Sequence, residues 1–228
     1  MPRRFSKILA LMGGWPLRRA AGALLCVLLL GPLLVSAWEP ETFLDAAAKL
    51  SPRTQQRARA LVQLIEKGSA QSDEARLTLV NNYFNQNIEF YTDQETWGVE
   101  DYWATPLESL EQGRGDCEDY AIAKYFTLLA MGVPEPRLRL VYVRAMLHGR
   151  PQAHMVLAYY AQVQGEPLVL DNLVADVRAA SQRPDLAPVF SFNSEGLWHG
   201  VGATRAGNPL QRLTQWRDLI GRLRAQGF

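Results

Sequence analysis

Three strand-like runs joined by short turns follow one apolar helix, and this order constrains the fold more than any other feature of the sequence. Apolar residues recur at helical spacing from Cys117 to Met131, and Gly132 ends that helix. The strand-like runs that follow are 138–146, 154–163 and 168–171. They are separated by turn residues at 149–151 and 164–167. Because such short turns join antiparallel neighbours, the region predicts a helix that leads into an antiparallel sheet.

Most of the other periodic segments are helical in pattern. Amphipathic spacing predicts helices at 43–50, 53–67, 73–86 and 210–224. Pro106 is placed to begin one further helical turn. Short extended pieces are expected at 88–91 and 189–192. The sequence therefore predicts an α+β fold, with N-terminal helices before the helix and sheet described above.

The first 37 residues have the composition of an export signal. Basic residues without any acidic residue occupy 1–19, an apolar run follows at 20–34, and small residues lie at 35–37. We predict a signal peptide over 1–37 and a single domain over 38–228. The apolar run is shorter than the about 20 residues that a membrane span needs. The alternative that the segment is an uncleaved inner-membrane anchor stays open.

Removing this segment changes the charge and the thiol content of the chain. The net charge of +1 over 228 residues becomes negative, because the segment contains only basic charges. No basic cluster elsewhere indicates nucleic-acid binding. Cys26 is also lost, so that Cys117 becomes the only cysteine. A single thiol in an oxidising compartment is expected to be buried or used.

Cys117 lies where a thiolate would be stabilised. It begins its predicted helix, with Asp116 as a predicted N-cap, so that free N–H groups and the helix dipole favour negative charge. The same N–H groups would hold an oxyanion after attack on a carbonyl. The neighbouring Asp116, Glu118 and Asp119 oppose this by raising the thiol pKa. An imidazolium or a bound cation must offset them.

His154 is the best candidate for that imidazole. His148 and His199 lie in predicted turns, whereas His154 begins an apolar strand. Asp171 ends the next apolar run, and a turn near Gly165 would bring it close to His154. A cysteine at a helix start with His and Asp on neighbouring strands is the arrangement of papain-like and transglutaminase-like thiol enzymes. A buried, inert cysteine with a structural histidine is the alternative.

Several segments resemble the bacterial transglutaminase-like cysteine proteases of the LapG type. The resemblance covers roughly Tyr83 to Trp198. Its segments are GRGDCEDYAIAKYFTLLAMGVP, AHMVLAYY and LVLDNL, with Thr105–Glu108 upstream and Ser191–Asn193 and Gly196–Trp198 downstream. It implies that Cys117, His154 and Asp171 are the catalytic triad. It also implies a calcium site that includes Asp116 and Glu118, with Asp119 as a further ligand.

The resemblance also implies a biological role. Proteases of this type are periplasmic, calcium-dependent endopeptidases that cut the N-terminal region of a large surface adhesin beside a pair of alanines. Cleavage releases the adhesin and disperses the biofilm. An inner-membrane receptor for cyclic di-GMP sequesters the protease. Calcium, the adhesin and the receptor are thus the expected cofactor, substrate and partner.

Two other functions are compatible with the residues. The triad would equally serve a transglutaminase-like amide transferase or an amidase of cell-wall peptides. A non-catalytic periplasmic binding module would have an unreactive Cys117. Trp103, which lies in a polar stretch, is expected to be exposed and available to a substrate or partner.

Overall fold

The N-terminal part of the domain consists of three helices. A computed structural model describes residues 38–162 and 165–228, so the predicted signal peptide and residues 163–164 of the predicted second strand and turn lie outside the described residues. The helices are α1 (Pro40–Ala48), α2 (Pro52–Ser69) and α3 (Asp73–Asn87). Ser51 and Ser72 cap α2 and α3 by accepting backbone N–H groups of the first turn. The predicted helices in this part are confirmed.

The segment between α3 and the cysteine is mostly loop, with short elements. These are β1 (Glu89–Phe90), α4 (Asp93–Thr96), α5 (Pro106–Gln112) and β2 (Arg114–Gly115). Thr92 and Glu95 form a capping box that begins α4, a helix that apolar periodicity did not predict. β1 and β2 pair in parallel. This pairing brings the chain around residue 90 close to the residues that precede Cys117.

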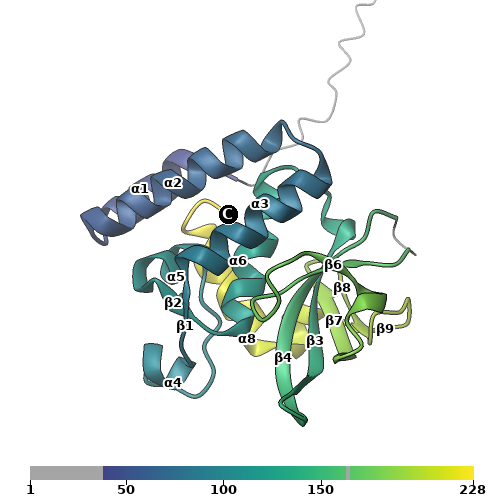
Figure 1. The fold of residues 1–228 in the computed structure, drawn as a ribbon. Coiled ribbons are helices and arrows are strands. Elements are labelled where there is room, and N and C mark those ends of the chain that lie inside the picture. The colour runs from purple at the N-terminus through teal and green to yellow at the C-terminus, as the bar shows by residue number, and fades with distance from the viewer. Residues whose placement is uncertain (1–37, 163–164) are drawn as a thin grey trace, which may run out of the picture. The chain divides into compact units, whose positions relative to one another are not determined.

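Helix α6 (Cys117–Ala130) is the central element of the domain. It packs against α3, α5 and β4, as Figure 1 shows. Almost every residue from Tyr120 to Leu128 is buried. The chain leaves the helix through Gly132, whose φ of 85° is a left-handed conformation that suits glycine. The predicted apolar helix is confirmed, and its position fixes the cysteine at the edge of the core.

The sheet has seven strands in the order β6-β5-β4-β3-β7-β8-β9, and all of its pairs are antiparallel. The strands are β3 (Leu138–Leu147), β4 (Arg150–Tyr159), β5 (Leu168–Leu170), β6 (Arg178–Ala179), β7 (Leu186–Asn193), β8 (Gly196–His199) and β9 (Arg205–Gly207). Short 3₁₀ helices lie at η1 (Glu135–Arg137) and η2 (Ala180–Gln182). The predicted α+β fold, with a helix packed on an antiparallel sheet, is confirmed.

The first hairpin turn is tighter than the sequence indicated. Leu147 pairs with Arg150, so the loop contains only His148 and Gly149, both with positive φ. Two such residues match the twist of the strands, whereas the predicted three-residue turn at 149–151 was wrong. Strand β4 therefore begins four residues before His154, and the histidine lies within the strand.

The C-terminal helices complete the core. They are α7 (Pro209–Arg212) and α8 (Thr214–Arg224), and Trp216, Leu219 and Leu223 of α8 are buried. Trp216 stacks on Phe126 of α6 at a ring-centroid distance of 5.8 Å. Among the described helices, each is either too short or too polar to cross a membrane.

Candidate active site

The predicted base and its orienting group are in direct contact. Nε2 of His154 lies 2.8 Å from Oδ1 of Asp171, and both residues are buried. Leu170 pairs with Leu157, and continuing this register would place residue 173 opposite His154. Asp171, the first residue after β5, therefore reaches His154 diagonally. The carboxylate accepts a hydrogen bond from Nε2–H, so in the neutral ring Nδ1 is the acceptor nitrogen.

Cys117 lies beside the same strand. Its sulfur is close enough to the backbone N–H of Met155, the residue after His154, for that N–H to favour the thiolate. On β4, strand β5 pairs only with residues 157–159, so it leaves the part of the β4 edge near His154 free for the start of α6. The structure thus brings Cys117, His154 and Asp171 together, while their catalytic roles stay predictions.

Burial and the neighbouring carboxylates both favour the protonated form of the Cys117 thiol. Burial raises the pKa of Cys117 strongly, and the charges of Glu118 and Asp116 raise it further. The sulfur donates to Oε2 of Glu118 at 2.9 Å. The structure therefore confirms that the neighbouring carboxylates disfavour the Cys117 thiolate. For Cys117 to act as a nucleophile, Glu118 must bind another group instead of the thiol.

Two further carboxylates join the predicted acidic group. Ligand atoms of Asp93, Asp101 and Glu118 lie within 4.8 Å of one another, and so do those of Asp93, Asp116 and Asp119. Asp93 belongs to α4 and Asp101 to the loop after it. Sequence spacing gave no sign of these two, because the parallel pairing of β1 and β2 is what brings the loop near the start of α6.

The cluster has the properties of a site for a hard cation. Oδ1 of Asp93 and Oδ1 of Asp116 are buried without a hydrogen-bond partner. Burial, followed by repulsion from neighbouring carboxylates, raises the pKa of Asp116 to about 8, and the pKa of Asp93 is raised to about 6 mainly by burial. Crowded carboxylate oxygens are the ligands that Ca²⁺ takes, and a dication would relieve the repulsion.

Asp119, the third predicted metal residue, has a structural role as well. It is buried, and its Oδ1 accepts the backbone N–H of Ala104 at 2.8 Å. Its Oδ2 accepts the N–H of Asp116 at 3.4 Å. Asp119 therefore ties the 101–105 loop to the start of α6, and its oxygens are less free for a cation than those of Asp93 and Asp116.

A cleft of about 650 Å³ is lined by near neighbours in sequence of the three candidate catalytic residues, which are not themselves part of its lining. Tyr120, Gln152 and Asn172 line it, and each is within three positions of Cys117, His154 or Asp171. Phe90 and Leu173, which are 55% and 43% exposed, provide apolar surface, and Arg150 provides a positive charge. The cleft is large enough for several residues of an extended peptide.

The predicted exposure of Trp103 is wrong. Trp103 is only 9% exposed and stacks on Phe192, with ring centroids 5.6 Å apart. Its indole N–H donates to Asp101 at 3.1 Å. The neighbouring Asp101 belongs to the acidic cluster, whereas the Trp103 ring belongs to the hydrophobic core.

The comparisons with known proteins define the family. The sequence profile described as bacterial transglutaminase-like cysteine proteinase matches residues 48–187. The chain therefore belongs to this family of bacterial transglutaminase-like cysteine proteinases, and it is a cysteine protease.

Solved structures agree with this assignment. An EGTA-treated form of LapG from Legionella pneumophila is 40% identical with a TM-score of 0.73, and the match covers 81% of this chain and 97% of that one. A calcium-bound form of the same protein is 41% identical with a TM-score of 0.70, covering 81% and 99%. No curated protein matches the chain. The family match favours a protease over the alternative of a non-catalytic binding module.

Proposed function

We propose that this chain is a calcium-dependent periplasmic endopeptidase that cleaves the N-terminal region of a large surface adhesin near a pair of alanines. The observation that carries the catalytic part is the His154–Asp171 contact at 2.8 Å beside the start of α6. The 40% identity to Legionella LapG over 97% of that chain supports the assignment to this type of protease.

Cys117, His154 and Asp171 perform the proposed hydrolysis through an acyl-enzyme. Nδ1 of His154 takes the thiol proton as the sulfur attacks the peptide carbonyl, and Asp171 stabilises the imidazolium through Nε2. The same proton is then donated to the leaving amine. Water, deprotonated by His154, attacks the thioester and releases the acid. Backbone N–H groups at the start of α6 would stabilise the oxyanion.

Asp93, Asp101, Asp116 and Glu118 are the residues that would hold calcium. Calcium supplies positive charge that neutralises these carboxylates. With calcium bound, Glu118 would no longer accept the Cys117 thiol, and the sulfur would be free to transfer its proton to His154. The existence of calcium-bound and EGTA-treated LapG structures supports this cofactor.

The substrate and the partner are proposed from the family resemblance. The cleft beside Tyr120 is open enough for an extended chain, and the family resemblance implies a pair of alanines next to the cleaved bond. The signal-like segment at 1–37 supports export to the periplasm. There an inner-membrane cyclic di-GMP receptor would sequester the protease, and release of the protease would disperse the biofilm.

Incubation of the purified protein with an adhesin N-terminal fragment tests the proposal. We expect one calcium-dependent cut, and we expect none with Cys117→Ala. Replacing the two alanines of the fragment by bulky residues should prevent the cut. An amine acceptor in the same reaction would reveal amide transfer as a cross-linked product. An intact fragment in the presence of calcium would exclude the proposed substrate.

A further inference from the structure

The second carboxylate oxygen of Asp171 is bound by an arginine that the sequence did not indicate. Nη2 of Arg183 lies 2.7 Å from Oδ2 of Asp171. The Asp171 side chain has no exposed surface and that of Arg183 is 3% exposed. Oδ1 meanwhile contacts His154 and accepts the N–H of Leu173 at 3.1 Å. Both oxygens of the orienting carboxylate are therefore occupied.

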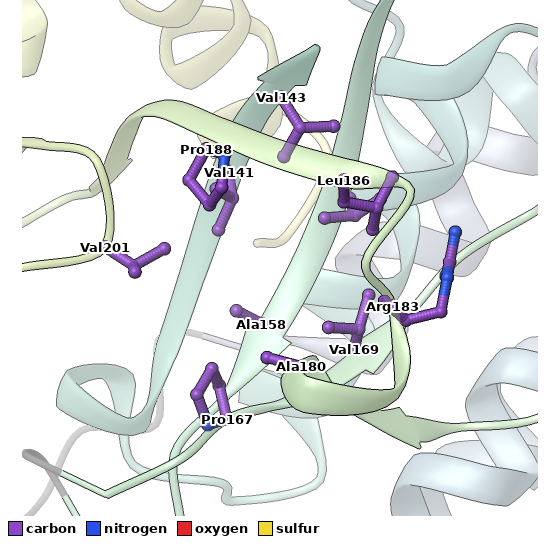
Figure 2. A pocket seen from close by; sticks show the side chains of 11 residues that line it. Val141, Val143, Ala158, Pro167, Val169, Ala180, Arg183, Leu186, Pro188 and Val201 are labelled. Atoms are coloured by element: carbon purple, nitrogen blue, oxygen red, sulfur yellow. The ribbon is translucent and has the colours of Figure 1, made fainter. Parts of the chain in front are cut away.

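Arg183 is itself held in one position. It follows η2, and its Nε and Nη2 bind the two oxygens of Asp185 at 3.0 and 2.8 Å. Its aliphatic part borders an apolar pocket of about 90 Å³ lined by Val169, Ala180 and Leu186. Figure 2 shows its guanidinium end pointing away from the side chains of Val169 and Ala180. The pocket thus packs the stem of Arg183 while the charged end is directed out of it.

We propose that Arg183 is a positioning residue of the triad, acting on His154 through Asp171. A carboxylate that is held at one oxygen can rotate about its Cβ–Cγ bond. Binding of Oδ2 by a planar guanidinium removes that freedom and keeps Oδ1 directed at Nε2 of His154. Because arginine stays protonated, Asp171 also stays ionised in its buried position.

Other charged groups near Asp171 do not replace this contact. Lys124 of α6 is fully buried, but its Nζ binds Oδ1 of Asn85 at 2.8 Å. Asn85 donates to the main-chain carbonyl of Asp171 at 2.9 Å and leaves the carboxylate untouched. Among the described residues, Arg183 is the only arginine or lysine with a hydrogen bond to the Asp171 carboxylate.

The test compares Arg183→Met and Arg183→Lys with Arg178→Met as a matched control. Arg178 belongs to the same segment and pairs only with Asp176 at the surface. The first readout is the downfield proton resonance of the His154 Nε2–H bonded to Asp171. The second is the rate at which iodoacetamide alkylates Cys117 in calcium-containing buffer, which needs no knowledge of the substrate.

We expect the wild type and Arg178→Met to show the resonance and to react equally fast. Arg183→Met should lose or shift the resonance and react roughly 10- to 100-fold more slowly, the loss that is typical when the hydrogen-bond partner of a metal-ligating side chain is removed. Arg183→Lys should recover part of both signals. The proposal is overturned if Arg183→Met leaves either the resonance or the alkylation rate unchanged.

Arg183→Met leaves a buried carboxylate without its partner, so this variant is the one at risk of not folding. If Arg183→Met does not fold, Arg183→Lys and Asp185→Asn test the proposal instead. Both variants keep a cation next to the buried Asp171 carboxylate and are therefore expected to fold. Asp185→Asn loosens the outer anchor of Arg183, and we expect a shifted resonance with alkylation slowed severalfold. Wild-type values for both measurements in these two folded variants would also overturn the proposal.

Discussion

Nε2 of His154 and Oδ1 of Asp171 lie 2.8 Å apart, with 4% and 0% of their side-chain surfaces exposed. A buried contact of this kind fixes both the orientation and the tautomer of the imidazole. Nδ1 is then available to accept a proton. Cys117, at the start of α6, lies beside the strand that carries His154. The catalytic account depends on this contact more than on any other.

Asp171→Asn should leave the fold intact and remove most of the activity. The amide cannot stabilise an imidazolium, and it can bind His154 in the wrong tautomer. The same Asp-to-Asn substitution in a Ser-His-Asp triad lowers kcat about 10⁴-fold, and we expect kcat to fall at least about 10³-fold here. The measurement is kcat on the cleaved fragment, with circular dichroism as the control for folding. Activity within tenfold of wild type would contradict the assigned role.

The Asp171 carboxylate should also make stability depend on pH in a defined window. Burial alone would raise its pKa, but the hydrogen bond and charge of His154, the Leu173 N–H and Arg183 outweigh burial and lower the pKa to about 2. Because the pKa of Asp171 is lower in the folded than in the unfolded chain, its ionised carboxylate stabilises the fold at pH values above the unfolded pKa near 4. This stabilisation is lost as the pH falls toward 2.

Urea unfolding of the wild type and Asp171→Asn at pH 5 and pH 2.5 isolates this contribution. The wild type should lose about 2 kcal/mol more of its free energy of unfolding than the variant over this interval. Equal losses in the two proteins would show that Asp171 is not held as an ion in the folded state.

Asp93→Asn should weaken calcium binding, because Asp93 contributes an unpartnered buried oxygen to the acidic cluster. Removing one charged ligand is expected to lower the affinity roughly tenfold or more. Glu100→Gln, an exposed neutralisation in the same loop, is the matched control and should bind as the wild type does. Isothermal calorimetry measures both. Identical affinities for wild type and Asp93→Asn would remove Asp93 from the site.

Phe90→Ala should impair substrate binding while preserving the chemistry. Phe90 presents a half-exposed ring to the cleft, and burying such a ring against a substrate is worth about 1.5–3 kcal/mol. We therefore expect KM to rise roughly tenfold or more at an unchanged kcat. Leu50→Ala, which also truncates an exposed apolar side chain but at the end of α1, should have no effect. An unchanged KM in Phe90→Ala would place the substrate elsewhere.

The contact between His154 and Asp171 was predictable because the two residues are linked by local rules. The apolar helix that begins at Cys117 and the hairpins that follow it leave few ways to place His154 and Asp171. The register between β4 and β5 was less predictable. The pairing of Leu157 with Leu170 means that Asp171 is not directly opposite His154, and the two side chains meet because they extend toward each other diagonally.

The remaining site residues depend on tertiary structure. Asp93 and Asp101 reach the cluster through the pairing of β1 with β2, which involves two residues per strand and leaves no periodic signal. Arg183 meets Asp171 through a loop between β6 and β7, twelve residues further along the chain. Such contacts between irregular segments have no spacing rule. Trp103 was misjudged for the same reason, since its burial comes from Phe192 in β7.

The most direct test of the account is proteolysis of the adhesin fragment by wild type and Cys117→Ala, each with calcium and with excess chelator. The account predicts one cut by the wild type in calcium, with none in chelator and none by the variant under either condition. Cleavage by a correctly folded Cys117→Ala protein would contradict it, since Cys117 is the only cysteine among the described residues.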